Sequence, residues 1–137
     1  MRDLVVVAKE VAEDDFDRMC EAVDLETDDF DAEDQAKFDG FKARIVRGVC
    51  RGQIVISEVG LPTVTLKYPV GEIQSVAFRF PTGGSLEAIG DTKKTNNVTK
   101  GWKVLEDLTG VPSSIFGKMR TKPDLAACEA LVALFLG

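Results

Sequence analysis

Two runs of alternating apolar and polar residues constrain the fold of this chain most strongly. The first run covers residues 63–68 and the second covers residues 74–80. Period-two alternation is typical of strands that bury one face. The Pro-Val-Gly-Glu sequence at residues 69–72 suits a turn, so we predict an antiparallel hairpin. Pro81 has no N–H for a ladder and is expected to end the second strand. The apolar members of the two runs are Val64, Leu66, Tyr68, Val76, Phe78 and Phe80.

Two helices and a further strand are predicted before this hairpin. Residues 13–23 repeat apolar side chains at three- and four-residue spacing, as an amphipathic helix does. A second helix is expected at residues 32–50, with Asp31 as its N-cap and Gly52 as its stop. Its apolar face would be Phe38, Phe41, Ile45, Val46 and Val49. Residues 53–57 then read as a third strand, so the sheet is expected to have about three strands.

Helices are also predicted after the hairpin. The last helix, residues 123–136, has apolar residues around about 200° of its circumference. A surface helix needs an apolar stripe of only about 100°. This helix is therefore either sandwiched inside the fold or leaves an apolar face for a partner. The other predicted segments are a short helix at 85–90, a polar loop at 91–97, a helix at 98–109 ended by Gly110, and a helical turn after Pro112 that holds Ile115 and Phe116.

The expected class is therefore α+β, with a small antiparallel sheet flanked by N-terminal and C-terminal helices. Residues 1–39 carry 15 acidic and 4 basic side chains, whereas residues 40–137 carry 8 and 13. We therefore predict an acidic helical N-terminal module at 1–52. A hairpin plus C-terminal helical domain at 53–137 is expected to pack with it as one unit. Its 137 residues and 45% hydrophobic content suffice for a core of this size.

Composition narrows the class of function. The net charge of −6 disfavours nucleic acid as a partner. No apolar run approaches the roughly 20 residues that span a bilayer, and residues 4–8 are too short for a secretory signal. A cytoplasmic protein without a membrane partner is therefore expected.

No residue pattern points to catalysis, a cofactor or a metal. The chain has no histidine, the commonest general base. Asp24, Glu26 and Asp28 suggest a calcium loop, but the loop lacks the glycine and the final glutamate that an EF-hand requires. The Gly-Gly-Ser at 83–85 suits an anion only weakly, and a turn with a helix cap is the favoured interpretation. The three cysteines, Cys20, Cys50 and Cys128, are read as small core hydrophobes.

Two basic groups have alternative interpretations. Arg44, Arg47 and Arg51 share one helix face, which would suit either a phosphate or pairing with the acidic first helix. A solvated face is a third possibility. The second group has the same alternatives and comprises Lys93, Lys94, Lys100 and Lys103.

Four segments in the second half of the chain resemble the phage tail assembly chaperones of Mu-like and related long-tailed phages. They are a strand that ends in proline, a strand with Pro-Thr-Gly before a helix, a leucine-rich helix that ends in Leu-Thr-Gly, and a terminal helix that begins at an aspartate. The segments are Thr63–Pro69, Phe78–Leu86, Val104–Val111 and Asp124–Leu136. Residues 1–52 are longer than the usual N-terminus of the family.

The resemblance implies a non-enzymatic assembly factor that acts in the host cytoplasm. Such a protein binds the tape measure protein and recruits tail tube subunits, and a homo-oligomer is compatible with this role. Its apolar groove for an amphipathic helix is expected at the last helix and the helical turn before it. The candidate partner-binding residues are Phe116, Leu131, Leu134 and Phe135. The alternatives are a structural tail or neck component of the virion and an acidic interaction or regulatory protein.

Overall fold

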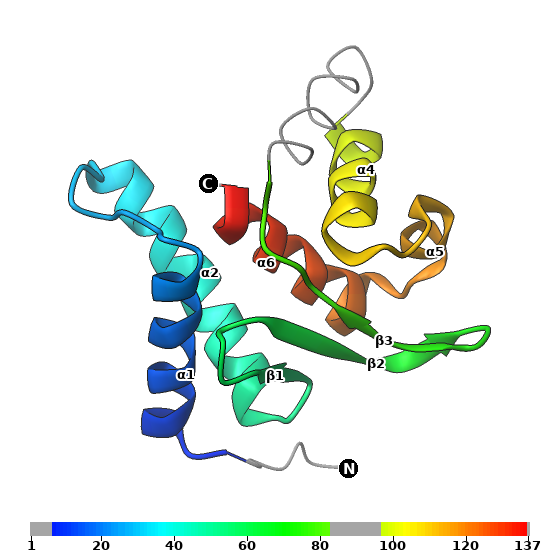
Figure 1. The fold of residues 1–137 in the computed structure, drawn as a ribbon, viewed down its shortest axis with the longest axis horizontal. Helices are drawn as coiled ribbons and strands as arrows, with labels where there is room; N and C mark the ends of the chain where they lie inside the picture. Colours follow the sequence, from blue (N-terminus) through cyan, green and yellow to red (C-terminus); the bar gives the residue numbers. More distant parts are fainter. Residues whose placement is uncertain (1–6, 83–96, 137) are drawn as a thin grey trace.

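The computed structural model has the predicted α+β class, with a three-stranded antiparallel sheet and helices before and after it (Figure 1). It describes residues 7–82 and 97–136, with only the backbone for residues 97–101 and 136. The helix predicted at 85–90 and the loop at 91–96 lie outside the described residues. The elements are α1 (Lys9–Ala22), α2 (Ala32–Cys50), β1 (Ile54–Ile56), β2 (Pro62–Val70), β3 (Ile73–Ala77), α4 (Asn97–Thr109), α5 (Ser113–Lys118), η1 (Thr121–Leu125) and α6 (Ala126–Leu136).

Helix α2 has the bounds that its sequence predicts. The Asp31 carboxylate accepts a hydrogen bond of 2.8 Å from the Asp34 N–H, which confirms the N-cap. Gly52 has a φ of 78° and ends the helix in the left-handed region. Helix α1 begins at Lys9, four residues before the predicted start. The prediction missed this first turn because its buried residue is Ala12, too small to mark an apolar face.

The sheet has the order β1-β2-β3, with Val64 of β2 paired to Ile54 on one side and to Val76 on the other. The predicted turn at 69–72 is wrong in part: β2 continues through Pro69 to Val70, and Gly71, with a φ of 58°, begins the turn. The expected end of β3 at Pro81 is also wrong. The strand ends at Ala77, because the chain leaves the sheet and the Arg79 N–H donates to the Leu108 carbonyl of α4 at 2.7 Å.

A buried carboxylate accepts the backbone donors that precede Pro69 in β2. Strand β1 is too short to pair with the far half of β2, so the backbone donors there need another acceptor. Asp124 is fully buried and supplies it: the N–H groups of Lys67 and Tyr68 donate to its two oxygens at 2.8 and 3.0 Å. The Gln53 side chain donates a third bond of 3.1 Å. Asp124 therefore replaces a strand at this edge and fixes the start of α6 against the sheet.

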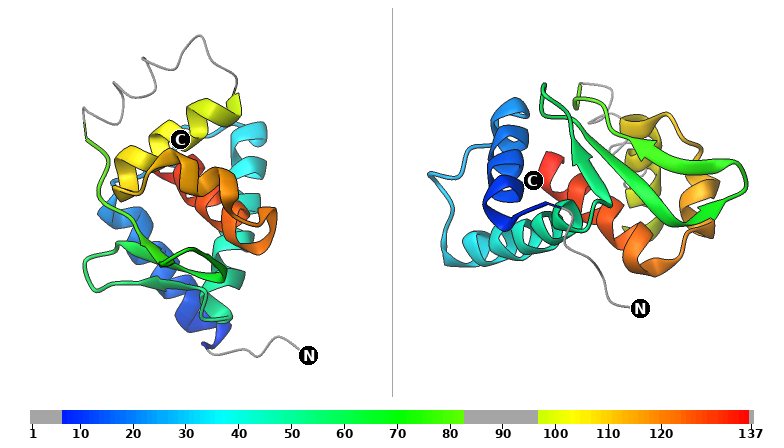
Figure 2. Two further views of the ribbon diagram at one scale, coloured as in Figure 1. Left: turned by 90° about the vertical axis from the view of Figure 1, so that its right-hand side faces the viewer. Right: turned by 90° about the horizontal axis from the view of Figure 1, so that it is seen from below.

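Helix α6 is packed between other helices. Of the two predicted uses of its wide apolar surface, burial inside the fold or exposure to a partner, the structure shows mainly burial. It lies between α2 and α4, as the views in Figures 1 and 2 agree. Its Phe135 ring meets Phe78 edge to face at 5.8 Å between centroids. Among the described side chains of α6, only Glu129 is exposed. Most of its apolar surface is therefore used inside the fold.

Candidate functional site

Among the described residues, no three His, Cys, Asp or Glu side chains are placed to hold a metal ion. The three cysteines are free. Burial raises the pKa of the Cys20 and Cys128 thiols from 9.0 to about 12, with nearby Asp17 and Asp124 as the next causes. These two thiols therefore stay protonated at neutral pH and are poor nucleophiles.

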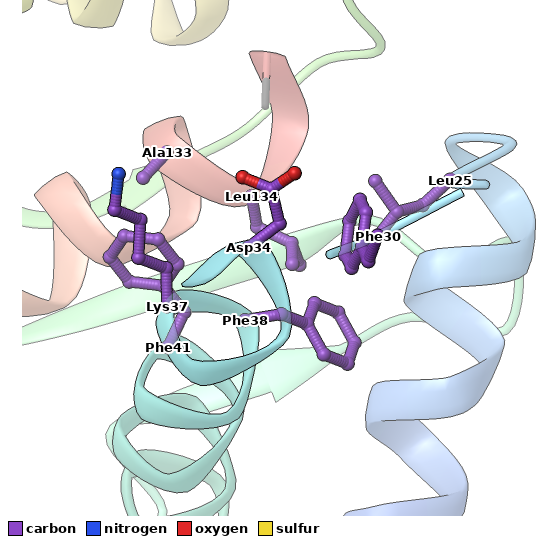
Figure 3. A pocket seen from close by; sticks show the side chains of 8 residues that line it. All are labelled: Leu25, Phe30, Asp34, Lys37, Phe38, Phe41, Ala133 and Leu134. Atoms are coloured by element: carbon purple, nitrogen blue, oxygen red, sulfur yellow. The ribbon is translucent and has the colours of Figure 1, made fainter. Parts of the chain in front are cut away.

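An apolar pocket lies between the first half of α2, the loop before it and the end of α6. We call it the α2–α6 pocket. Its volume is about 180 Å³. In Figure 3, Leu134 lies among the rings of Phe30, Phe38 and Phe41, while Asp34 and Lys37 stand at the margin. The remaining two lining residues are Leu25 and Ala133. A cavity of about 150 Å³ holds a benzene ring, so this pocket has room for one large apolar side chain.

Local sequence explains why these aromatic side chains remain half-buried. The α2 residues nearer the C-terminus, such as Ile45 and Val49, are fully buried between α1, β1 and α6. Phe38 and Phe41 lie nearer the start of α2, where the acidic loop is their neighbour. Phe30 folds back from that loop and meets Phe38 edge to face at 5.8 Å. The three rings therefore form an apolar floor that water still reaches.

The charged residues that line the α2–α6 pocket are Asp34 and Lys37, and the segment around them is acidic. The loop from residue 24 to residue 31 and the first turn of α2 carry seven carboxylates. Lys37 is the basic residue on the rim, and its charge is offset by an ion pair of 3.4 Å with Glu33. The apolar pocket is therefore set in a negative field, which favours a ligand with an apolar side chain and positive flanks.

The candidate partner-binding residues are largely buried in this structure. Phe116 and Leu131 are fully buried, and Leu134 and Phe135 are 3% and 8% exposed. Buried side chains of this kind hold the fold together and offer little surface to a partner. Leu134 is the exception, because one side of it lines the α2–α6 pocket. The sequence reasoning did not single out Phe30, although a phenylalanine inside an acidic loop is an unusual enough feature to have indicated it.

The two basic groups have different outcomes. Among the described residues, Arg44 and Arg47 form no ion pair, so pairing with the acidic first helix does not occur. They are exposed and border a hollow at the other end of α2. Of the second group, Lys93 and Lys94 lie outside the described residues. The backbone of Lys100 lies in α4, which also holds Lys103.

Comparison of the chain with protein-family models, curated proteins and solved structures finds no match. No helix within residues 7–82 and 97–136 has the length and apolar character needed to cross a bilayer.

Proposed function

We propose that this chain is a non-enzymatic phage or prophage tail assembly chaperone that acts in the host cytoplasm. In this role it binds an amphipathic helix of the tape measure protein at the α2–α6 pocket and recruits tail tube subunits. The observation that carries the proposal is the pocket itself, which combines a floor of three phenylalanines with a charged rim.

The segments that carry the family resemblance support the proposal, because they contact one another. Asp124, which opens the last segment, accepts from Lys67 and Tyr68 in the first. Arg79 of the second segment donates its N–H to Leu108 of the third. The four segments are thus the scaffold that places Leu134 behind the pocket. A shared scaffold is the kind of feature that a family pattern preserves, because losing either contact leaves buried polar groups unsatisfied.

The chemistry of the pocket fits a helical client. A bare amphipathic helix exposes an apolar stripe that aggregates, and a chaperone must cover it. An apolar side chain of the helix would enter between Phe30, Phe41 and Leu134. Basic residues on the flanks of the helix would face the acidic loop. Buried aromatic contacts of this kind dominate binding energy at protein interfaces.

Capture of a tape measure fragment from the same phage or prophage tests the proposal. The two proteins are co-expressed and purified through a tag on the fragment. We expect Phe30→Ala to weaken capture at least about tenfold, because removing an aromatic anchor costs 2 kcal/mol or more. Phe80→Ala is the matched control, because Phe80 is 43% exposed and lies outside the pocket. Thermal melting confirms that both variants fold.

Two results would count against this function. Equal capture of the fragment by wild type and by the folded Phe30→Ala variant would show that the pocket is not its binding site. Recovery of the chain from purified virus particles would instead favour a structural tail or neck component, since a chaperone is absent from the finished virion.

A further inference from the structure

A second hollow lies at the opposite end of α2 from the pocket. Arg44, Arg47 and Arg51 line it from α2, and Lys122 lines it from the segment before α6. Its volume is about 250 Å³. The floor consists of Gly48, Ile54, Pro123, Ala126 and Ala127. We call this feature the cationic hollow.

Three of the four basic side chains that line the cationic hollow have no ion pair within the described part of the chain. Arg44, Arg47 and Lys122 are exposed and have no ion pair there. Three uncompensated cations around one hollow are notable in a protein whose net charge is −6. Guanidinium groups match carboxylates with paired hydrogen bonds. The hollow is therefore suited to a segment that carries several carboxylates.

The same chain carries such a segment. Asp24, Glu26, Asp28 and Asp29 are exposed in the loop between α1 and α2, and we call them the acidic tip. They too have no ion pair among the described residues. A tip and a hollow of opposite charge are thus present on every copy.

The acidic tip cannot reach the cationic hollow of its own chain. The tip precedes α2, whose two ends lie far apart (Figure 1). Arg47 lies in the last turn of α2, and Arg51 directly follows it. At about 1.5 Å of rise per residue, about 24 Å of helix separates Asp31 from Arg47. That separation exceeds the screening length of about 8 Å at physiological salt. The rigid helix keeps the two features apart, so any pairing must occur between molecules.

We propose that the cationic hollow binds the acidic tip of a second copy of this chain. Because every copy carries the same negative net charge, two copies repel each other in most orientations. The orientation that brings the acidic tip of one copy to the cationic hollow of the other is attractive and is therefore favoured. Because tip and hollow lie at opposite ends of α2, two copies can pair reciprocally in a two-fold dimer with two tip–hollow contacts. A single contact per pair of copies would instead extend into a ring or an open chain.

The acidic tip belongs to the loop that borders the α2–α6 pocket, whereas the cationic hollow lies outside that pocket. The hollow variant R44E/R47E therefore tests this proposal without altering the pocket of the proposed function.

Charge-reversal variants test the proposal by sedimentation velocity at several protein concentrations and in low and high salt. We expect the wild-type average mass to rise with concentration in low salt to about twice the monomer mass or more, and to fall in high salt. The tip variant D28K/D29K and the hollow variant R44E/R47E should each remain monomeric. All four positions are exposed, and circular dichroism checks the fold.

Mixing the two variants gives the decisive result. The lysine tip of one variant then meets the glutamate hollow of the other, while the aspartate tip of the second meets the arginine hollow of the first. We expect association to return in the mixture and not in either variant alone. A monomeric mixture would overturn the proposal. So would a wild-type chain that stays monomeric but captures a poly-glutamate peptide through Arg44 and Arg47, which would assign the hollow to a foreign acidic segment.

Discussion

Asp124 is the single residue whose loss should damage the fold most clearly. It is fully buried and accepts three hydrogen bonds, two of them from backbone N–H groups of β2 that have no strand beside them. In Asp124→Ala these two N–H groups lose their acceptor. Each buried donor left unsatisfied costs about 1–3 kcal/mol, so we expect a loss of about 4 kcal/mol. With an unfolding entropy of about 2.1 cal/mol/K per residue, the midpoint temperature should fall by about 14 °C.

Urea unfolding followed by circular dichroism measures this loss. Asp124→Asn keeps one acceptor oxygen but turns an amide donor toward a backbone donor, so we expect an intermediate loss of about 2 kcal/mol. Asp14→Ala is the control, because Asp14 is exposed on α1 and its removal should change stability by less than about 0.5 kcal/mol. If Asp124→Ala lost less than the Asn variant, or no more than the control, the role given to this carboxylate would be wrong.

Two further predictions concern helix packing and thiol reactivity. Gly40→Ala should stabilise the protein by about 1 kcal/mol through helix propensity, because a Cβ there meets no atom within 4 Å. Gly48→Ala should destabilise the protein by about 1 kcal/mol, because the new Cβ would lie 2.6 Å from Ile54 Cδ1. Urea unfolding of both variants measures whether the two changes in unfolding free energy have opposite signs. Cys20 and Cys128 should react slowly with iodoacetamide at pH 8, because only the ionised thiolate reacts. At that pH a thiol with a pKa of about 12 is ionised in about one molecule in 10,000, whereas a thiol with the ordinary pKa of 9.0 is ionised in about one in ten. Peptide mass spectrometry measures this, and labelling as fast as in the urea-unfolded chain would contradict it.

The parts of the fold that depend on local chemistry could be predicted from the sequence. Helix α2 is the clearest case, since Asp31 and Gly52 mark its two ends within a few residues of the bonds they satisfy. The parts that failed depend on contacts between distant segments. Pro69 looks like a turn residue, but β2 continues through it to Val70, where the pairing with β3 is irregular. The end of β3 is likewise set by the bond from Arg79 to Leu108.

The candidate site could be predicted only in part, for a similar reason. The pattern of α2 indicated an apolar face that includes Phe38 and Phe41, and the last helix was expected to contribute Leu134. The local sequence pattern is the same for a phenylalanine that lines an open pocket and for one that is buried in a core. Phe116 and Phe135 were candidates for the groove and are buried, because α4 packs on α5 and α6 and Phe78 packs on Phe135.

The central claim is that the α2–α6 pocket holds an apolar anchor of a helical partner. Titration of the isotope-labelled chain with a helical tape measure fragment, followed by amide chemical shifts, tests it most directly. We expect the largest shifts at Phe30, Phe38 and Leu134, with residues of the β2–β3 turn unchanged. Shifts confined to surfaces away from these three residues, with the fragment bound, would contradict it.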